Sequence, residues 1–378
     1  MTENYTALYE QHKKAGASFT DFGGWQMPLK YESELAEHHA VRNSAGLFDL
    51  SHMGEVWVTG SDAAAFLDFA LVGKLSAVAV GKAKYSLICD ADGGIIDDLI
   101  SYRRPSPEEG VDQYLVVPNA GNAKVVAAAL LERAAGFDVV VDDASAETSL
   151  IAVQGPNAEA ILLTLVPAEQ HALVSELKYY AAVEVSINGQ DLLLARTGYT
   201  GEDGFEIYIP NLDAAGLWEA LLEVGEGHGL IPAGLAARDS LRLEAGMPLY
   251  GNELSRYVNA YAAGLGPVVS LAKESDFIGK EALTGIKAAG VGSTIGQKLV
   301  GLKGAGRRAA RAHYSVLKDG SLIGEVTSGQ PSPTLGYPIA LAYVDVEHSA
   351  PGTIVEVDLR GKSESFEIVQ LPFYKRVK

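Results

Sequence analysis

Hydrophobic and polar residues alternate along much of this chain with the two-residue period of β-strands, and helical stretches interrupt the alternation. Between Gly54 and residue 142 this pattern predicts the order strand, helix, three strands, helix, strand, which is typical of an α+β sheet with helices on one face. The expected elements are a strand through Val56 and Val58, a helix at Ala63–Leu71, strands at 84–89, 95–102 and 113–117, a helix from Asn119 or Asn122 to Arg133, and a strand at Phe137–Val141.

Further elements are expected on both sides of this unit. Two helices are predicted before it, at residues 3–16 and 32–45, because glycines follow each apolar stripe. Residues 148–210 are strand-rich, and Asn188-Gly189 between two alternating runs indicates a tight hairpin. Helices at 212–224 and 234–245 follow.

The last part of the chain has a different pattern. Residues 285–296 are rich in Gly, Ala and Ser and are interpreted as a linker. Short, evenly spaced strands after the linker predict a small barrel or sandwich, with strands near 298–303, 313–317, 321–327, 339–344, 353–358 and 365–371. The expected domains are therefore residues 1–284, with an inserted ferredoxin-like unit at 54–142, and residues 285–378.

Composition and charge narrow the class of protein. The chain has 378 residues, a net charge of −18 and one cysteine, and it lacks an apolar run long enough to span a bilayer. An acidic protein repels nucleic acid and anionic lipid, so neither is expected as a partner. The single cysteine and the absence of a signal-like N-terminal pattern predict a cytoplasmic protein, and we expect a monomer.

Metal and nucleotide sites are not expected. No histidine pair has metal-ligand spacing, so no metal cofactor is predicted. The run Gly304-Ala305-Gly306 partly matches a dinucleotide fingerprint, but a strand follows it where the fingerprint requires a helix.

Two adjacent carboxylates, Asp97 and Asp98, interrupt an apolar strand. Neighbouring side chains on a strand point to opposite faces, so the two cannot form a proton-sharing pair. An inward carboxylate among apolar neighbours has a raised pKa and is a candidate acid or base. A strand-end carboxylate that caps the Gly93-Gly94 turn explains the pattern equally well.

The densest motif runs from Arg196 to Glu206 and includes three glycines, which allow the backbone to approach a planar group closely. Tyr199 could stack on such a group, and Glu206 could accept two parallel N–H bonds from an amidine-like edge such as that of a pterin or guanine. The alternative is a glycine-rich hairpin loop with solvated acids.

A third candidate lies on the helix predicted at 234–245. Arg238 and Arg242 are four residues apart and share one face, where either could hold a ligand carboxylate. An internal ion-pair network is the alternative.

Taken together, these motifs resemble the aminomethyltransferase family, the T-proteins of the glycine cleavage system. The resemblance covers nearly the whole chain, and its specificity comes from the order of the matching stretches. These are Asp21–Pro28, Gly46–Gly54, Gly93–Asp98, Arg196–Glu206, Ala233–Asp239, Phe277–Leu283, Thr327–Gly336 and Pro372–Tyr374.

The resemblance implies an α+β fold in a three-domain ring, with two interleaved folate-binding units and a C-terminal β barrel. It implies transfer of a methylene group from the aminomethyl-dihydrolipoyl arm of the H-protein to tetrahydrofolate, a co-substrate, with release of ammonia. It implies Asp98 as the catalytic carboxylate. The implied folate-binding residues are Met53, Tyr85, Tyr102, Tyr179, Tyr199, Glu206, Arg238, Arg311 and Tyr374.

The chain departs from many relatives at Pro267, where they have tryptophan, and at Ala260, where they have proline. Two alternatives within the superfamily stay open: a folate-binding accessory protein without turnover, and a folate-dependent demethylase. Basic residues at Lys303, Arg307, Arg308 and Arg311, and at Lys375, Arg376 and Lys378, are expected to form a patch for anionic partners, or else to be two unrelated solvated stretches.

Overall fold

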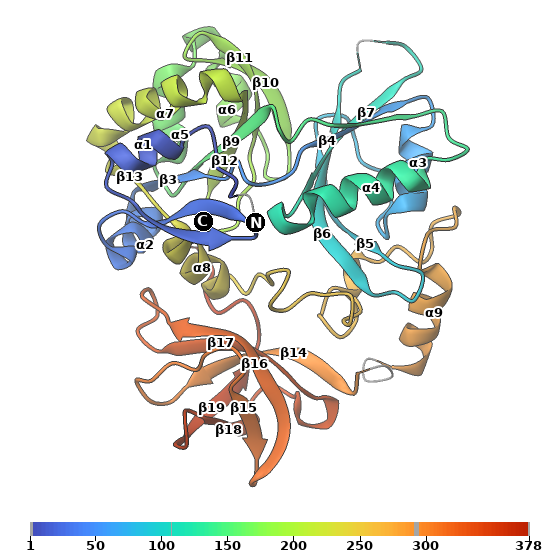
Figure 1. Cartoon of the computed structure of the whole chain (residues 1–378), viewed down its shortest axis with the longest axis vertical. Coiled ribbons are helices and arrows are strands. Elements are labelled where there is room, and N and C mark those ends of the chain that lie inside the picture. Colours follow the sequence, from blue (N-terminus) through green and yellow to red (C-terminus); the bar gives the residue numbers. More distant parts are fainter. Residues whose placement is uncertain (1–2, 107, 291–294, 377–378) are drawn as a thin grey trace. The chain divides into compact units, whose positions relative to one another are not determined.

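The computed structural model describes residues 3–106, 108–290 and 295–376 (Figure 1). The chain divides into two compact units. The first comprises residues 1–67, 75–85 and 99–239, and the second comprises residues 68–74, 86–98 and 240–378. The division falls within helices α3 and α8 and within strands β5 and β6, so four elements have residues in both units.

A six-stranded sheet forms the centre of the first unit. Its strands follow the order β10-β11-β12-β9-β3-β13, antiparallel at the registered pairs except for β13, which runs parallel to β3. Their bounds are β3 Ala45–Asp49, β9 Thr148–Gln154, β10 Ala182–Ile187, β11 Gln190–Ala195, β12 Gly204–Pro210 and β13 Leu230–Pro232. The predicted hairpin is confirmed, since Asn188 and Gly189 both have positive φ, at 51° and 78°, between β10 and β11.

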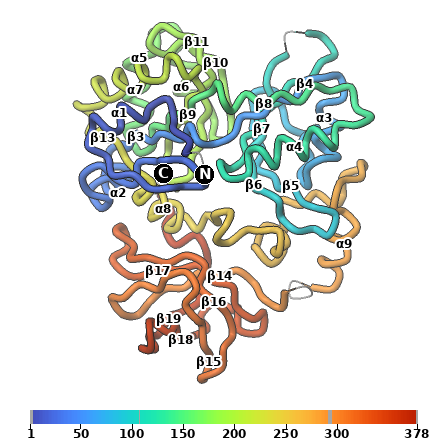
Figure 2. Tube along the Cα trace, in the orientation of Figure 1, coloured from blue at the N-terminus to red at the C-terminus, as the bar shows by residue number. Residues whose placement is uncertain are grey.

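Helices cover one face of this sheet and leave the other face open to a second sheet. Helices α5 (Ala158–Leu165) and α7 (Asn211–Gly225) lie side by side and contact β12 (Figures 1 and 2). Alternate residues such as Ile207 pack into that core, whereas Glu206 and Tyr208 point the opposite way. The polar side chains of β12, Glu206 and Tyr208, therefore lie on the face of the sheet that the helices do not cover.

A five-stranded sheet follows the order β5-β6-β7-β4-β8. Its elements, in chain order, are β4 Val56–Gly60, α3 Ala63–Ala70, β5 Ala83–Cys89, β6 Ile95–Arg104, β7 Asp112–Pro118, α4 Ala123–Arg133 and β8 Val140–Asp143. This is the predicted strand and helix order, and helices α3 and α4 lie beside the sheet (Figure 1). Apart from β5, the strand order is that of a βαββαβ unit.

The N-terminal expectations are only partly correct. The helix predicted at 3–16 is shortened to α1 (Tyr9–Lys14), and the helix predicted at 32–45 is α2 (Glu34–Asn43), capped by Ser33. Residue 45 already begins β3, because the apolar run from Ala45 is buried on both faces of a sheet, as in a central strand. The hairpin of β1 (Ser18–Phe22) and β2 (Trp25–Lys30) was not predicted from the pattern.

Two further helices complete the first unit or lead out of it. Helix α6 (His171–Ser175) precedes β10, and α8 (Leu235–Glu244) matches the helix predicted at 234–245. Short 3-10 turns occupy Ala120–Asn122, Ala168–Gln170, Glu226–His228, Gly266–Val268 and Val346–His348.

The C-terminal strands close into a barrel in the second unit, in the order β14-β17-β16-β15-β18-β19. The predicted α+β class with a C-terminal β barrel is thus confirmed. The strands are β14 Gln297–Gly304, β15 Ser315–Lys318, β16 Ser321–Pro331, β17 Pro338–Asp345, β18 Ile354–Asp358 and β19 Ser363–Val369. Closure satisfies the edge groups that an open sheet would leave unpaired.

The linker prediction for residues 285–296 is wrong in its first part. Residues 285–289 complete helix α9 (Lys280–Ala289), whose buried Leu283 and Ile286 anchor it, so glycine content alone misled the prediction. Residues 291–294 lie outside the described part of the chain.

One lysine of the second unit is buried in the structure. The Lys273 ammonium donates hydrogen bonds to the carbonyl oxygens of Asp68, Leu71 and Gly73, at 2.5, 2.6 and 2.9 Å, and lies 4.2 Å from the ring centre of Phe277. These carbonyls belong to the end of α3 and the turn after it, where helix carbonyls lack internal partners. Over the described residues, no helix combines the length and apolar character needed to cross a membrane.

Candidate active site

The glycine-rich loop before β12 is closed around a protein side chain, not around a ligand. The Gln154 amide donates to the carbonyl of Thr197 at 3.1 Å and accepts from the Thr200 hydroxyl at 2.9 Å. A Cβ atom at Gly198 would lie 2.0 Å from Gln154 Oε1, and one at Gly204 would lie 2.5 Å from Gln154 Cδ. The planar group that packs against these two glycines in the structure is therefore the Gln154 amide.

The acidic residues of this loop are held in ion pairs, which rules out the alternative of solvated acids. Arg196 pairs with Asp203 at 2.5 Å and with Glu159 at 2.9 Å. Glu202 pairs with the buried Arg42 at 2.9 Å. These contacts fix the loop on the sheet and so fix the start of β12.

Glu206 follows two residues after the loop, on the open face of the six-stranded sheet. Its Oε2 atom accepts a short hydrogen bond from the Thr197 hydroxyl and a longer one, 3.5 Å, from Tyr102. The Tyr102 and Thr197 hydroxyls are themselves 2.9 Å apart. Both donors reach Oε2 and neither reaches Oε1, so Oε1 retains acceptor capacity.

The charge state of Glu206 reflects competing effects. Burial raises the pKa of Glu206, and the Thr197 bond, the positive charge of Arg238 and the Tyr102 hydroxyl oppose that rise. Desolvation likewise lowers the pKa of Arg238, although Glu206 partly compensates for it. Each group is thus the main charged neighbour that stabilises the other.

Arg238 and Arg242 do not share a role. The Arg238 guanidinium lies over the Tyr199 ring, 5.0 Å from its centre, in cation–π geometry. Arg242, in the second unit, pairs with buried Glu253 at 2.9 Å and donates to Ser328. For Arg242 the internal ion-pair alternative is therefore correct.

His52 is a buried group to which the sequence analysis gave no role. Its Nδ1 atom has no hydrogen-bond partner among the described residues, and its ring makes an edge contact with Phe22. Burial, reinforced by the charge of Arg238, lowers the pKa of His52 to about 4. The sequence feature that could have drawn attention to His52 is its position beside Met53 in the matching stretch Gly46–Gly54, and that position gives no indication of burial.

Asp97 and Asp98 point to opposite faces of β6, as alternation requires. Asp97 is completely buried and Asp98 is only partly buried. The inward, buried carboxylate of the pair is therefore Asp97, not Asp98, the residue that the resemblance implies as catalytic. Asp98 shares its face of β6 with Tyr102, four residues later, on the side away from Asp97.

The other predicted residues differ in exposure and in unit. In the first unit, Tyr102 is fully buried, Met53, Tyr85 and Tyr199 are partly buried, and the Tyr179 side chain is half exposed against Tyr180. In the second unit, exposed Arg311 donates to the carbonyl of Gly329 at 3.2 Å, and the Tyr374 backbone N–H donates to the carbonyl of Glu244. The structure brings together Glu206, Tyr102, Arg238 and Tyr199 through direct or shared contacts.

The structure is thus an α+β fold with a C-terminal barrel and a partly buried cluster of a carboxylate, an arginine and two tyrosines in its first unit. Two family models match the chain: the GCVT N-terminal domain over residues 8–273, and the glycine cleavage T-protein C-terminal barrel domain over residues 297–375. The chain belongs to the glycine cleavage T-protein family.

Individual relatives match over almost their full length. An aminomethyltransferase from Streptomyces avermitilis is 56% identical over 376 residues, which covers 99% of this chain and 98% of the relative. One from Bacillus subtilis is 45% identical, with 98% of this chain and 99% of the relative covered. The crystal structure of glycine cleavage system aminomethyltransferase T from Bartonella henselae has a TM-score of 0.89 at 38% identity and covers 98% of each chain.

Proposed function

We infer that the chain is an aminomethyltransferase of the glycine cleavage system. It transfers the methylene carbon of an S-aminomethyldihydrolipoyl H-protein to tetrahydrofolate, and the products are 5,10-methylenetetrahydrofolate, ammonia and dihydrolipoyl H-protein. The observation that carries this proposal is the full-length match, at 56% identity, to a relative with that activity in its name.

Glu206 recognises the pterin edge of the folate in this proposal. A pterin presents two adjacent N–H donors in one plane, and a carboxylate with a free oxygen can accept them in parallel. The contacts from Thr197 and Tyr102 hold Oε2 in place, which orients Oε1 toward an incoming ring. The charge of Arg238 favours the ionised form of Glu206, and the Tyr199 ring beneath Arg238 offers an aromatic surface.

Asp98 acts as the catalytic carboxylate. It accepts a hydrogen bond from the reacting nitrogens of the folate, which raises their nucleophilicity toward the aminomethyl carbon as ammonia leaves. Support comes from its place on the same strand face as Tyr102 and from its match to the family motif Gly93–Asp98. Met53, Tyr85 and Tyr179 contribute pocket walls, and Arg311 and Tyr374 close the pocket.

The domain boundaries belong to the same proposal. Residues 1–284 form the folate-binding catalytic region with an inserted unit at 54–142, and the barrel domain follows. Because α9 is continuous to Ala289, the junction is better placed after that residue than at 285. This junction lies in the interval between the two family-model matches, which end at residue 273 and begin at residue 297.

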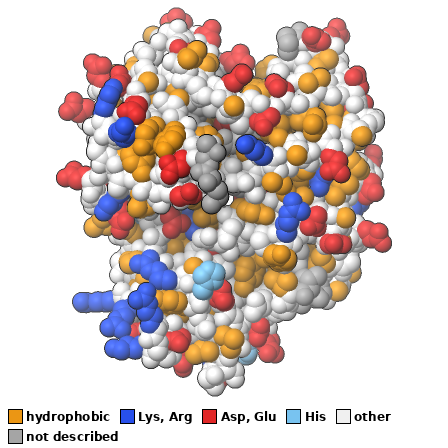
Figure 3. Space-filling view, viewed as in Figure 1, with side chains coloured by type: hydrophobic (Ala, Val, Ile, Leu, Met, Phe, Trp, Pro, Cys, Tyr) orange, Lys and Arg blue, Asp and Glu red, His pale blue; other side chains and the backbone are white. Residues whose placement is uncertain are grey.

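The H-protein is the proposed macromolecular partner, and the chain acts as a monomer in the cytoplasm without nucleic acid or membrane. Side chains of Lys303, Arg307, Arg308 and Arg311 are exposed in the second unit, and basic side chains gather over the barrel in Figure 3. Lys375 and Arg376 follow β19, whereas Lys378 lies outside the described residues. Local positive charge on an acidic protein would attract an acidic H-protein and the glutamate tail of folate.

Ammonia release tests the proposed function. Mixing the protein with aminomethylated H-protein and tetrahydrofolate should release ammonia and form 5,10-methylenetetrahydrofolate in equal amounts. Folate binding without ammonia release would instead indicate an accessory protein. Turnover of an N-methylated amino acid in place of the H-protein would indicate a demethylase.

A further inference from the structure

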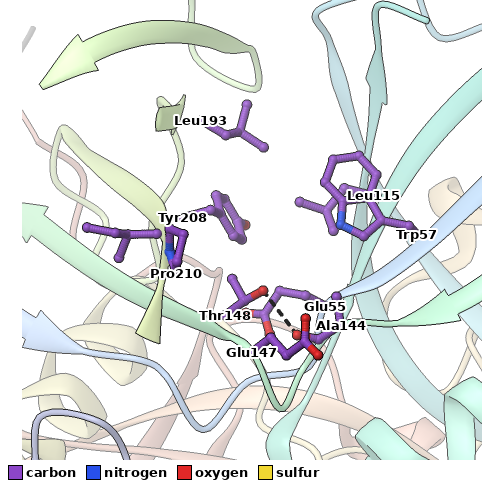
Figure 4. A pocket seen from close by; sticks show the side chains of 10 residues that line it. Glu55, Trp57, Leu115, Ala144, Glu147, Thr148, Leu193, Tyr208 and Pro210 are labelled. Atoms are coloured by element: carbon purple, nitrogen blue, oxygen red, sulfur yellow. Dashed lines mark hydrogen bonds between the residues drawn. The ribbon is translucent and has the colours of Figure 1, made fainter. Parts of the chain in front are cut away.

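A second pocket, of about 300 Å³, lies within the first unit between the open faces of its two sheets (Figure 4). Trp57 and Leu115 of the five-stranded sheet form one wall, and Leu193 and Tyr208 of the six-stranded sheet form the other. The Tyr208 ring packs edge-on against Tyr102, with ring centres 6.0 Å apart. Tyr102 thus has its hydroxyl at Glu206 and its ring against a wall of this second pocket.

The base of the pocket holds an unpaired carboxyl group. The Glu55 side chain is 1% exposed, and neither of its oxygens has a hydrogen-bond partner among the described residues. Its backbone is fixed, since its N–H donates to the Ser145 hydroxyl and its carbonyl accepts from Ala144 N–H, both at 2.9 Å. A buried carboxyl without a partner is costly unless a ligand supplies one.

The remaining charges at this pocket are negative. Glu147 lines the pocket and Asp143 lies close to Glu55, whereas none of the ten described lining residues is Lys, Arg or His. Rings of Trp57 and Tyr208 on opposite walls offer the π-faces that attract cations. An anionic ligand would meet only repulsion here.

We propose that this pocket binds a small organic cation, a primary ammonium on an apolar body, with the ammonium on Glu55 and the body between Trp57 and Tyr208. The site is separate from the proposed folate site, and the proposal does not depend on the transferase function. Its volume is at the lower end for ligand pockets, which limits the ligand to a small ring or short chain.

Protonation gives the proposal a distinctive signature. Burial, together with the charge of Asp143, raises the pKa of Glu55 well above its usual range. The protonated form of Glu55 is therefore favoured when the pocket has no ligand. When an ammonium binds, the carboxyl ionises and releases that proton to the buffer, while the ammonium keeps its own proton.

The experiment compares benzylamine, which is protonated at pH 7, with benzyl alcohol, which has a similar shape and no charge. Calorimetry should show benzylammonium binding at least ten times more tightly than the alcohol. The binding heat should change between buffers of different ionisation enthalpy, corresponding to release of up to one proton per ligand. Equal affinity for the two probes, or no binding of benzylammonium at 10 mM (about the weakest affinity worth calling a site), would overturn the proposal.

Substitutions of residues that line the pocket test whether benzylammonium binds there. Glu55→Gln should reduce benzylammonium affinity at least tenfold and abolish the buffer dependence, whereas Glu147→Gln, at an exposed position, should change affinity less than threefold. Trp57→Leu should also weaken binding, since it removes one aromatic wall. Unchanged affinity and buffer dependence in Glu55→Gln would contradict the proposal even if benzylammonium binds elsewhere. The comparison of the two probes on the unsubstituted protein keeps the test valid if a variant fails to fold.

Discussion

Glu206 combines a partly satisfied carboxylate with a neighbouring arginine, and its replacement should separate binding from folding. Glu206→Gln keeps the shape but places an N–H₂ donor where a pterin edge also donates. Affinity for tetrahydrofolate should fall by about 2–4 kcal/mol. Calorimetry on the folded variant measures this, and an unchanged dissociation constant would remove Glu206 from the folate site.

The neighbouring carboxylates of β6 form a matched pair for testing catalysis. Asp98→Asn should lower kcat by ~10²-fold or more with an unchanged melting temperature, because it removes a charged acceptor from a partly exposed position. Asp97→Asn alters a completely buried carboxylate and should lower the melting temperature instead. If Asp98→Asn retained near-normal turnover, Asp97 would become the candidate for the catalytic carboxylate.

His52 should make the stability of the protein depend on pH below neutrality. Its pKa is about 4 in the folded chain and near 6.5 when unfolded, so the unfolded chain binds more protons between these values. The stability that neutral His52 contributes is complete above pH 6.5 and is lost as pH falls toward 4, by about 3 kcal/mol.

Denaturant unfolding across that pH range checks the effect of His52. The free energy of unfolding of His52→Asn should fall less steeply than that of the unsubstituted protein. His313→Asn serves as the control, since the His313 side chain is 86% exposed. Parallel pH profiles for the unsubstituted protein and His52→Asn would show that His52 titrates normally.

At the scale of elements, the loop that precedes β12 should tolerate no side chain at its glycines. Gly198→Ala places Cβ against the Gln154 amide, which is buried and bonded on both sides, so it should destabilise the fold by about 1–3 kcal/mol. Adding Gln154→Ala should recover part of that loss, giving a non-additive double-mutant cycle. Gly216→Ala, within helix α7 and with open space around its Cβ, should be neutral or stabilising.

Element boundaries show what the sequence could predict. Strands of the barrel were predicted within a few residues because alternation and turn glycines are local signals. The strand Ala45–Asp49 was not predicted, and the helix expected at 32–45 overran into its first residue, because a strand buried on both faces has no alternation to reveal it. Residues 285–289 were assigned to a linker because helix α9 is stabilised by tertiary burial of Leu283 and Ile286, which composition does not encode.

The same limit applies to the site. The candidate roles of Glu206 and Arg238 were inferred from residue type, spacing and the resemblance to the family, and they stay predictions. The partners of the glycine-rich loop could not be predicted from the sequence, since Gln154 lies on another strand and 43 residues separate it from Thr197. The burial of His52 and Glu55 also could not be predicted from the sequence. Each of them is next to a residue that is common in exposed turns, Ser51 and Gly54 respectively.

At the scale of the whole molecule, the distribution of charge should govern association with the H-protein. Reversing Arg307 and Arg308 to glutamate should slow association and raise KM, with little change in kcat, because exposed charges act on encounter more than on chemistry. The KM of the unsubstituted protein should rise with salt, since screening acts within ~8–10 Å at physiological ionic strength.

The control for this prediction is the same charge change at exposed Lys124 and Lys287, which lie outside the basic segments. Equal effects of the two double variants would mean that only net charge matters. A KM independent of salt would exclude electrostatic attraction altogether.

The bonds of Lys273 have a consequence for the order in which the chain is made. The ammonium group lies 205 residues beyond the Asp68 carbonyl that accepts its hydrogen bond. At roughly 5–20 residues per second, a ribosome needs roughly 10–40 s to extend the chain over that distance. During that interval the Lys273 ammonium cannot bond these carbonyls, and the second unit, which comprises residues 68–74, 86–98 and 240–378, lacks its barrel. A nascent chain therefore completes this unit late, after the whole of the first unit has been synthesised.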